Sequence, residues 1–424
     1  MNREQILLSL TQSGMDAARI EVLPEAVKMA HAMEAGLACA DAEIPMIPCY
    51  LRTDGHVADG AKAIVIDAGG TNFRTALVRF DGQGASVSRL VKKKMPGVEK
   101  PASWDELIGF VADALEPLLP EAEDIGFCFS YSAEITPEID GRVIRIDKEV
   151  VIRGAEGKLV GQSLKEELAR RGYPNKRVVV LNDTAAVLLG GLATGEKCAY
   201  SGLIGQVSGT GTNTCCVLPL RRIGKLGCDD DDRVLVNLES GLYDGLPRGD
   251  FDRRLDDNSN NPGKKHLEKL TAGGYLGELA RLILEHMAAQ GLLSATAWED
   301  VCALGRFDAA KLDAWACGEG YPNRASEEDR LVLETVAQQL FERSARAMCV
   351  NLLAILLLTG EGETEEKPVL ICAEGSLVQK GRYYRPVLER LLAEGAQALG
   401  RHLRYQVGEE TTLPGSAAAV LLNR

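Results

Sequence analysis

The pattern of hydrophobic and polar positions predicts a chain in which strands and helices alternate. Short β-branched runs bounded by turn residues predict strands, and apolar residues spaced near 3.6 predict helices. The expected strands are residues 64–66, 75–78, 85–91, 125–130, 177–181, 201–207, 214–218, 369–373 and 404–407. The expected helices are residues 26–37, 104–119, 164–171, 184–193, 267–290, 308–316, 327–358 and 384–399, followed by a last apolar helix after Pro414. In the third strand, Ala85, Val87 and Val91 are expected on one face.

The order of these elements predicts an α/β fold with an internal repeat. A strand, a glycine turn and a returning strand open the segment that begins near residue 64, and the same arrangement begins again at residue 201. A chain of 424 residues exceeds what one hydrophobic core usually organises. We therefore expect two related lobes with a cleft between them.

Charge and cysteine content exclude several classes of function. A net charge of −13 argues against sequence-independent binding of nucleic acid or of an anionic membrane, because both need clustered Lys and Arg. The eleven cysteines are scattered, without Cys-x-x-Cys spacing, so neither a disulfide framework nor a zinc site is expected. The N-terminal residues are too polar for a secretory signal. These features predict a cytoplasmic protein.

Two glycine-rich turns carry the strongest chemical signal. Asp67-Ala-Gly69-Gly70-Thr71-Asn72 and Ser208-Gly209-Thr210-Gly211-Thr212-Asn213 each lie between two strands. Glycines let the backbone approach a ligand closely, and successive N–H groups with Thr hydroxyls can donate to phosphate oxygens. A tight hairpin explains either turn alone equally well, but the pair predicts one nucleotide held from two sides. The spacing fits neither the Rossmann fingerprint nor a P-loop.

Five motifs in this chain together resemble the hexokinases. They are Asp67-Ala-Gly-Gly-Thr-Asn-Phe-Arg74, Leu181-Asn-Asp-Thr184, Gly209-Thr-Gly-Thr-Asn213, Asn261-Pro-Gly263 and Tyr275-Leu-Gly-Glu-Leu279. The likeness runs in order along nearly the whole chain. It implies a duplicated ribonuclease H-like fold, as in actin, and a free cytosolic, bacterial relative. It further implies a small lobe of residues 56–194 completed by helix 412–424, and a large lobe of residues 1–55 and 195–411.

The resemblance assigns a catalytic base and a metal position. Asp183 matches the base that takes the proton of the attacking hydroxyl, and it follows a predicted strand where α/β sheets place ligands. The alternative for Asn182-Asp183-Thr184 is a helix N-cap, and both roles can hold. Asp67 matches the carboxylate that holds Mg²⁺ through water. The implied cofactors are ATP and Mg²⁺.

The remaining site residues also follow from the resemblance. The nucleotide is expected at Gly69, Gly70, Thr71, Asn72, Arg74, Gly209, Thr210, Gly375, Ser376 and Ser416, together with Asp67. The sugar is expected at Ser130, Lys148, Asn182, Asp183, Asn213, Glu239 and Glu268, with Lys148 also assigned to catalysis. Alone, each of these polar residues is more often a solvated or capping side chain.

Three positions depart from the family pattern and leave the substrate open. Ser132 replaces a proline, Asp147 a threonine, and Lys265 a glutamine near Glu268. The first expectation is therefore an ATP-dependent hexose 6-kinase acting on glucose or a related hexose. The alternatives are a kinase for a different hexose or amino sugar, a non-catalytic sugar sensor, and an actin-like or chaperone-like ATPase. A monomer and a homodimer are equally compatible with the sequence.

Overall fold

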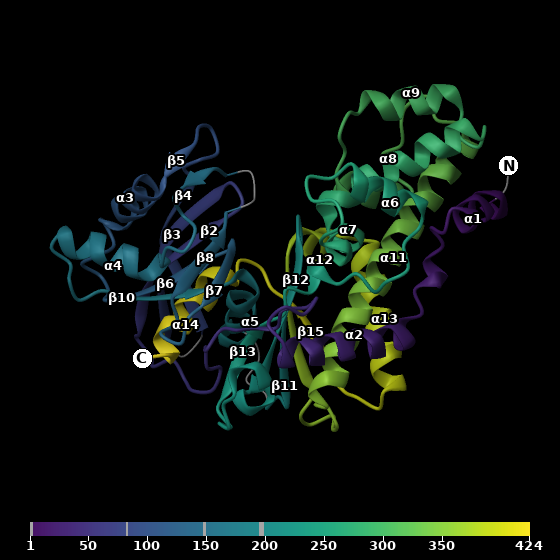
Figure 1. Ribbon diagram of the computed structural model, residues 1–424. Coiled ribbons are helices and arrows are strands. Elements are labelled where there is room, and N and C mark those ends of the chain that lie inside the picture. Colours follow the sequence, from purple (N-terminus) through teal and green to yellow (C-terminus); the bar gives the residue numbers. More distant parts are fainter. Residues whose placement is uncertain (1–2, 82–83, 147–149, 195–198) are drawn as a thin grey trace.

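A computed structural model describes residues 3–81, 84–146, 150–194 and 199–424, and it shows two lobes side by side (Figure 1). The smaller lobe is built on a five-stranded sheet of order β10-β6-β2-β3-β4. Its strands are β2 (Lys62–Gly69), β3 (Asn72–Asp81), β4 (Gly84–Lys94), β6 (Asp124–Phe129) and β10 (Arg177–Leu181). β2, β3 and β4 are antiparallel neighbours, whereas β6 and β10 run parallel to β2.

The larger lobe repeats this topology. Its sheet has the order β1-β13-β12-β11-β14-β15. The strands are β1 (Ile47–Pro48), β11 (Gly202–Ser208), β12 (Thr212–Pro219), β13 (Arg233–Asn237), β14 (Val369–Glu374) and β15 (Leu403–Val407). Again three antiparallel strands, β11 to β13, are followed across the sheet by two strands parallel to the first. The expected duplicated, actin-like α/β fold is confirmed.

Helices cover both sheets and fill the space between them. α3 (Trp104–Leu115) and α4 (Val160–Arg170) pack on the outer face of the small sheet. The large lobe carries α2 (Val22–Ala38), α7 (His266–Thr271), α8 (Gly273–Ala289), α11 (Glu327–Thr359) and α13 (Tyr384–Ala398). Further α-helices are α1 (Arg3–Gln12), α6 (Asp250–Asp257), α9 (Ala295–Ala303), α10 (Ala309–Ala316) and α12 (Ser376–Lys380). The short strands are β5 (Ala102–Ser103), β7 (Ser132–Ile135), β8 (Gly141–Arg145) and β9 (Ile152–Arg153).

Two helices join the lobes. α5 (Asp183–Thr194) and α14 (Thr412–Leu422) lie between the sheets, in one buried cluster with residues of β2, β3, β12 and β14 (Figure 1). α14 packs against β2 and β6, so the C-terminal helix lies on the small sheet. The lobe boundaries at residues 56, 194 and 412 stay a prediction.

Three expectations about individual elements are wrong. A bulge between Leu77↔Ser88 and Thr75↔Val91 adds a residue to β4, so Val87 and Val91 face opposite sides. The helix after Ser103 begins with the expected cap, but it ends at Leu115 and not at residue 119, two residues before Pro117. The expected helix 267–290 is divided into α7 and α8 at Ala272.

The long apolar segment before residue 358 is the buried end of α11, as expected. Among the described residues, no helix combines the length and the apolar character needed to cross a membrane.

Candidate active site

The carboxyl ends of three parallel strands bring the first group of site residues together. Asp67 of β2 pairs with Cys128 of β6, which in turn pairs with Leu181 of β10. Ser130 follows β6 and donates its N–H to the Ala68 carbonyl, 3.0 Å away. Asp183 follows β10 at the start of α5. Three residues from separate motifs therefore share one edge of the small sheet, as the expected site requires.

Electrostatics supports this arrangement around Cys128. Burial raises the pKa of the Cys128 thiol well above its ordinary value, and the charges of Asp67 and Asp183 raise it further. One buried thiol therefore experiences the field of both carboxylates. The expected magnesium carboxylate and the expected base are neighbours across the ends of the strands.

The start of α5 combines a helix cap with the candidate base. Asn182 Oδ1 accepts the Thr184 N–H at 3.0 Å and the Thr184 hydroxyl at 2.8 Å. Asp183 Oδ1 also accepts the Thr184 N–H, at 2.9 Å. The capping interpretation therefore holds for Asn182, whose side chain satisfies a first-turn donor. Because α5 lies between the sheets, this cap fixes the Asp183 backbone at the junction of the two lobes.

Across the junction, amide side chains hold a half-buried carboxylate. Asn213 Nδ2 and Asn237 Nδ2 donate to Glu239 Oε1 at 3.1 and 2.8 Å, respectively. Burial raises the pKa of Glu239 above 4.5, and the nearby charge of Asp183 raises it further. The Thr184 hydroxyl reaches Asn237 Oδ1 at 3.4 Å, which links α5 to the end of β13.

Asn237 is a site residue that the sequence analysis missed. It ends β13, a strand that was not expected, so no strand end pointed to it. The available signal was the spacing Asn237-Leu-Glu239, with the amide two residues before a recognised site residue.

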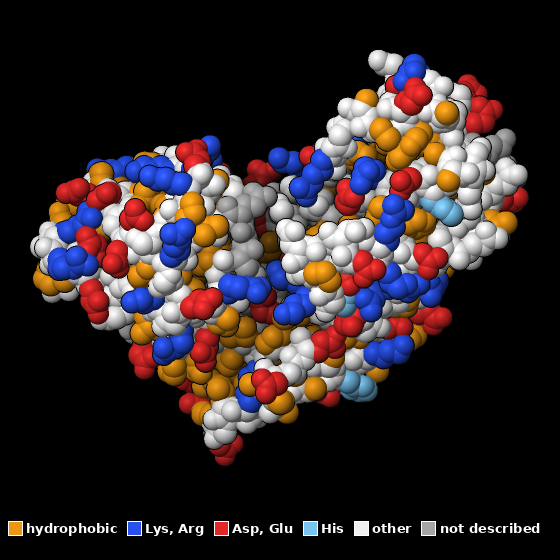
Figure 2. Space-filling model, turned by 45° about the horizontal axis from the view of Figure 1, so that its top comes forward, with side chains coloured by type: hydrophobic (Ala, Val, Ile, Leu, Met, Phe, Trp, Pro, Cys, Tyr) orange, Lys and Arg blue, Asp and Glu red, His pale blue; other side chains and the backbone are white. Residues whose placement is uncertain are grey.

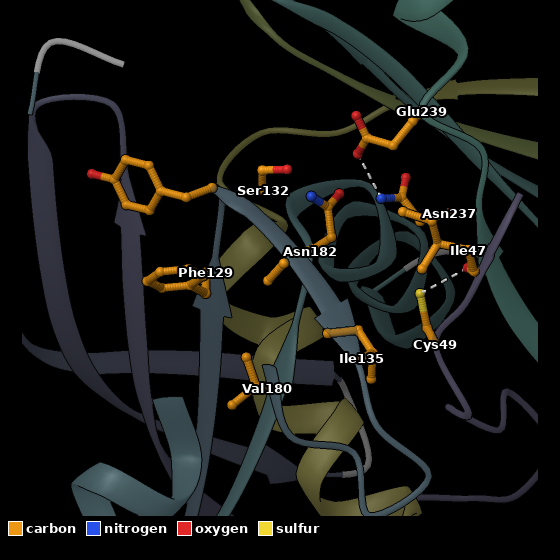
Figure 3. A pocket seen from close by; sticks show the side chains of 11 residues that line it. Ile47, Cys49, Phe129, Ser132, Ile135, Val180, Asn182, Asn237 and Glu239 are labelled. Atoms are coloured by element: carbon orange, nitrogen blue, oxygen red, sulfur yellow. Dashed lines mark hydrogen bonds between the residues drawn. The ribbon is translucent and has the colours of Figure 1, made fainter. Parts of the chain in front are cut away.

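A small pocket lies between these two groups. It is lined by Ile47, Cys49, Phe129, Tyr131, Ser132, Ala133, Ile135, Val180, Asn182, Asn237 and Glu239. Ser132 and Asn182 lie on the small-lobe side, and Asn237 and Glu239 face them from the large lobe (Figure 3). The space-filling view shows the molecule hollowed between the lobes (Figure 2). Polar groups on an apolar floor are typical of a pocket for a small hydroxylated ligand.

Glu268 of α7 lies beside the second glycine turn. Its Oε2 accepts the Thr212 N–H at 3.2 Å, and its Oε1 lies 3.4 Å from Lys265 Nζ. The charge of Glu268 also raises the pKa of Glu239. The structure therefore brings Asp183, Glu239 and Glu268 into one electrostatic neighbourhood.

The first glycine turn is formed as a tight β2–β3 connection. Gly70 has φ +58°, and the Tyr131 hydroxyl donates to its carbonyl at 2.7 Å. A Cβ on Gly69 would lie 3.0 Å from the Ser130 Cβ, so the close approach to β6 favours glycine. Thr71 and Asn72 follow on the partly exposed side of the turn.

Arg74 is paired with the candidate magnesium carboxylate. Its Nε and one terminal nitrogen lie 2.8 and 2.6 Å from Asp67 Oδ2. The guanidinium is a donor fork that suits phosphate oxygens, and only 20% of this side chain is exposed. Asp67 and Arg74 are therefore presented together beside the first turn.

The second glycine turn is packed against two other glycine segments. A Cβ on Gly375, which has φ +120°, would lie 2.3 Å from the Ser208 carbonyl oxygen, so only glycine fits there. A Cβ on Gly274 would lie 2.7 Å from the Thr210 carbonyl oxygen. Gly209, Thr210, Gly375 and Ser376 are consequently adjacent, as the expected nucleotide site requires.

Ser416 is the expected nucleotide residue that the structure does not bring to this site. It is fully buried in α14, and its hydroxyl donates to the Thr412 carbonyl at 2.7 Å. The backbone of Ser416 packs directly on Gly126 of β6. A helix interior thus encloses the residue that the sequence placed beside the nucleotide. Asp147 and Lys148 lie outside the described residues.

The residues present fit a magnesium ion that is held mainly by water and phosphate. In the described part of the chain, no group of three or more His, Cys, Asp or Glu side chains could hold a metal. Mg²⁺ needs no such group, because it commonly keeps several waters and binds one or two carboxylates plus substrate phosphates. Asp67, partly accessible at the first turn, meets that requirement.

Comparisons with known proteins match this arrangement. Two hexokinase family models match residues 14–192 and 203–422. Hexokinase-1 of Saccharomyces cerevisiae is 31% identical over 277 residues, which cover 61% of this chain and 56% of the yeast protein. Hexokinase-1 of rice is 29% identical over 411 residues, or 87% of this chain and 81% of the rice protein. The structure of a Schistosoma mansoni hexokinase complexed with glucose superposes with a TM-score of 0.80, at 22% identity and with both chains fully covered.

The duplicated fold, with its paired glycine turns and shared carboxylate edge, places the protein in the actin-like α/β class, and the matching family models make it a phosphotransferase of that class. Within this class the family models together cover nearly the whole chain. The protein belongs to the hexokinase family.

Proposed function

We propose that this protein is an ATP-dependent hexose 6-kinase that transfers the γ-phosphate of ATP to the 6-hydroxyl of glucose or a related hexose. The observation that carries the proposal is the position of Asp183. It lies at the helix start between the lobes, just after a strand end that is one strand away from Asp67 in the small sheet. Thr184, the next residue, reaches Asn237 of the large lobe at 3.4 Å, and Asn237 in turn donates to Glu239. A base there can reach a sugar held by the large lobe while a nucleotide is held by the glycine turns.

Each group of residues then has a defined task. Asp183 accepts the proton of the attacking hydroxyl, while Ser130, Asn182, Asn213, Glu239 and Glu268 orient the sugar, with Lys148 as a further expected contact. The backbone donors of the two turns, with Thr71, Asn72, Arg74, Thr210 and Ser376, hold the phosphates. Asp67 would hold Mg²⁺ through water, and the bound ion would supply positive charge to the phosphates. The enclosed hydroxyl of Ser416 supports no such contact.

An assay of ADP release over glucose, mannose, fructose and glucosamine tests the proposal. We expect release that depends on the hexose and a 6-phosphate product detectable by NMR. Sugar binding without turnover would instead indicate a sensor, and hydrolysis independent of sugar would indicate an ATPase. The cytoplasmic location, the bacterial origin and the choice between monomer and homodimer stay predictions.

A further inference from the structure

Three of the expected sugar-site residues, Asp183, Glu239 and Glu268, carry carboxylates, and one lysine that departs from the family pattern lies beside Glu268. The carboxylates of Asp183 and Glu268 both raise the pKa of Glu239, beyond the effect of its burial, and Lys265 lowers it. Lys265 Nζ lies 3.4 Å from Glu268 Oε1. The Lys265 side chain is 33% exposed and that of Glu268 is 16% exposed, so the pair is only partly open to solvent.

The backbone of Lys265 has a conformation that residues other than glycine seldom adopt. Its φ is +58°, in the left-handed region, immediately before α7. The next residue is fixed by two acidic groups: His266 Nδ1 lies 2.7 Å from Asp244 Oδ1, and His266 Nε2 lies 3.2 Å from Asp256 Oδ2. A backbone strained in this way persists where its surroundings fix it.

Asp256 and His266 form a buried cluster with Lys269, and this cluster also holds the residues that precede Lys265. Asp256 Oδ2 accepts the Gly263 N–H at 3.0 Å, and the buried ammonium of Lys269 pairs with Asp256 and donates to the Asn261 carbonyl at 2.9 Å. The cluster therefore restrains the chain on both sides of Lys265. The turn that carries Lys265 is therefore held in place next to Glu268 by hydrogen bonds and ion pairs on both sides.

We propose that Lys265 is a specificity-determining residue that selects neutral hexoses over cationic amino sugars. Its charge cancels part of the negative field of Glu239 and Glu268, which would otherwise attract an ammonium group on the substrate. The inference rests on the proposed function, because it takes this pocket as the sugar site.

Calorimetric titration of glucose and glucosamine without ATP tests the inference. At about pH 6.5 the amino sugar is charged, by analogy with an α-amino group of pKa near 7.7–8.0. In Lys265→Gln we expect the ratio of the two dissociation constants to shift about tenfold toward glucosamine, since a partly screened unit charge is removed nearby. At about pH 9, where the amine is neutral, that shift should disappear.

Two variants serve as matched controls. Lys265→Arg keeps the charge and should keep the ratio, and Lys264→Gln removes the same charge from the adjacent exposed position and should leave it unchanged. An unaltered ratio in Lys265→Gln, an equal shift in Lys264→Gln, or a shift that persists at about pH 9 would overturn the inference.

The titration also separates this inference from the proposed function, because it needs no phosphoryl transfer. Sugar binding with the expected shift, but without ADP release, would overturn the kinase proposal alone. Normal phosphorylation of glucose with an unshifted ratio would overturn the inference alone. Failure to bind either sugar would overturn both.

Discussion

Glu239 shows how a single half-buried carboxylate can make binding depend on pH. Its oxygen accepts two amide donors, yet burial and the nearby charge of Asp183 raise its pKa above 4.5. The folded protein therefore takes up a proton at Glu239 at a higher pH than the unfolded chain does. Above pH 4.5, this residue's contribution to the free energy of unfolding falls as pH rises.

Hexose binding should respond to pH in the opposite direction. An ionised Glu239 only accepts hydrogen bonds, which suits sugar hydroxyls, so affinity should fall as the pH is lowered through the raised pKa. As the pH is lowered, we expect the dissociation constant for glucose to begin rising while the pH is still above 4.5, the ordinary pKa of a Glu side chain. Calorimetry over a pH series measures this change. Glu239→Gln should bind more weakly with a flatter profile, and an equally steep profile in that variant would assign the titration elsewhere.

The sequence identified residues that belong to recognisable motifs and missed Asn237, which contacts one of those residues. Asp67 and Asp183 follow recognisable strands, so their shared edge could be predicted before any coordinates. Asn237 was missed because polar residues in 229–232 obscured the strand that carries it, so that only its spacing from Glu239 pointed to it. For Ser416 the motif gave the residue type, but its burial was not visible in the sequence, because it depends on the packing of α14. Its role in nucleotide binding stays a prediction.

At the scale of elements, α5 depends on glycine to fit between the lobes. A Cβ on Gly190 would lie 2.0 Å from the Thr411 carbonyl oxygen, just before α14. A Cβ on Gly415 of α14 would lie 1.8 Å from the Ala186 carbonyl oxygen of α5. The two helices thus cross in backbone contact, and this contact with α14 fixes the position of α5, which begins at Asp183.

Gly190→Ala should therefore destabilise the protein, although alanine is the better helix former. Overpacking a close contact typically costs about 1–3 kcal/mol, which exceeds the gain of about 1 kcal/mol in helix propensity. Thermal unfolding measures the difference. The matched control is Gly109→Ala in α3, where a Cβ would meet nothing within 4 Å, and its midpoint should stay or rise. Equal stability of both variants would contradict the backbone crossing.

Local pattern predicted which elements exist better than where they bend. The continuous helical periodicity of residues 267–290 hid the break at Ala272, where the N–H of Gly273 donates instead to the Gly209 carbonyl at 2.8 Å. The β4 bulge was similarly invisible, because the alternation of apolar residues carries no record of one extra residue. The break at Ala272 thus depends on a contact with a distant segment.

At the scale of the molecule, the site exists because one topology occurs twice. Each sheet contributes a glycine turn between its first two strands, β2–β3 in one lobe and β11–β12 in the other. The repeated turn was visible in the sequence and correctly predicted the duplication. The closeness of Asp183 to Glu239 was not visible, because it depends on how α5 packs between the sheets.

The most direct test of the account is the turnover number of Asp183→Asn, measured beside its affinity for glucose. The substitution keeps the size of the side chain but removes the proton acceptor. We expect kcat to fall on the order of 10²-fold or more, while the dissociation constant for glucose changes little. Near-normal turnover in this variant would contradict the central claim that Asp183 takes the proton from the sugar hydroxyl.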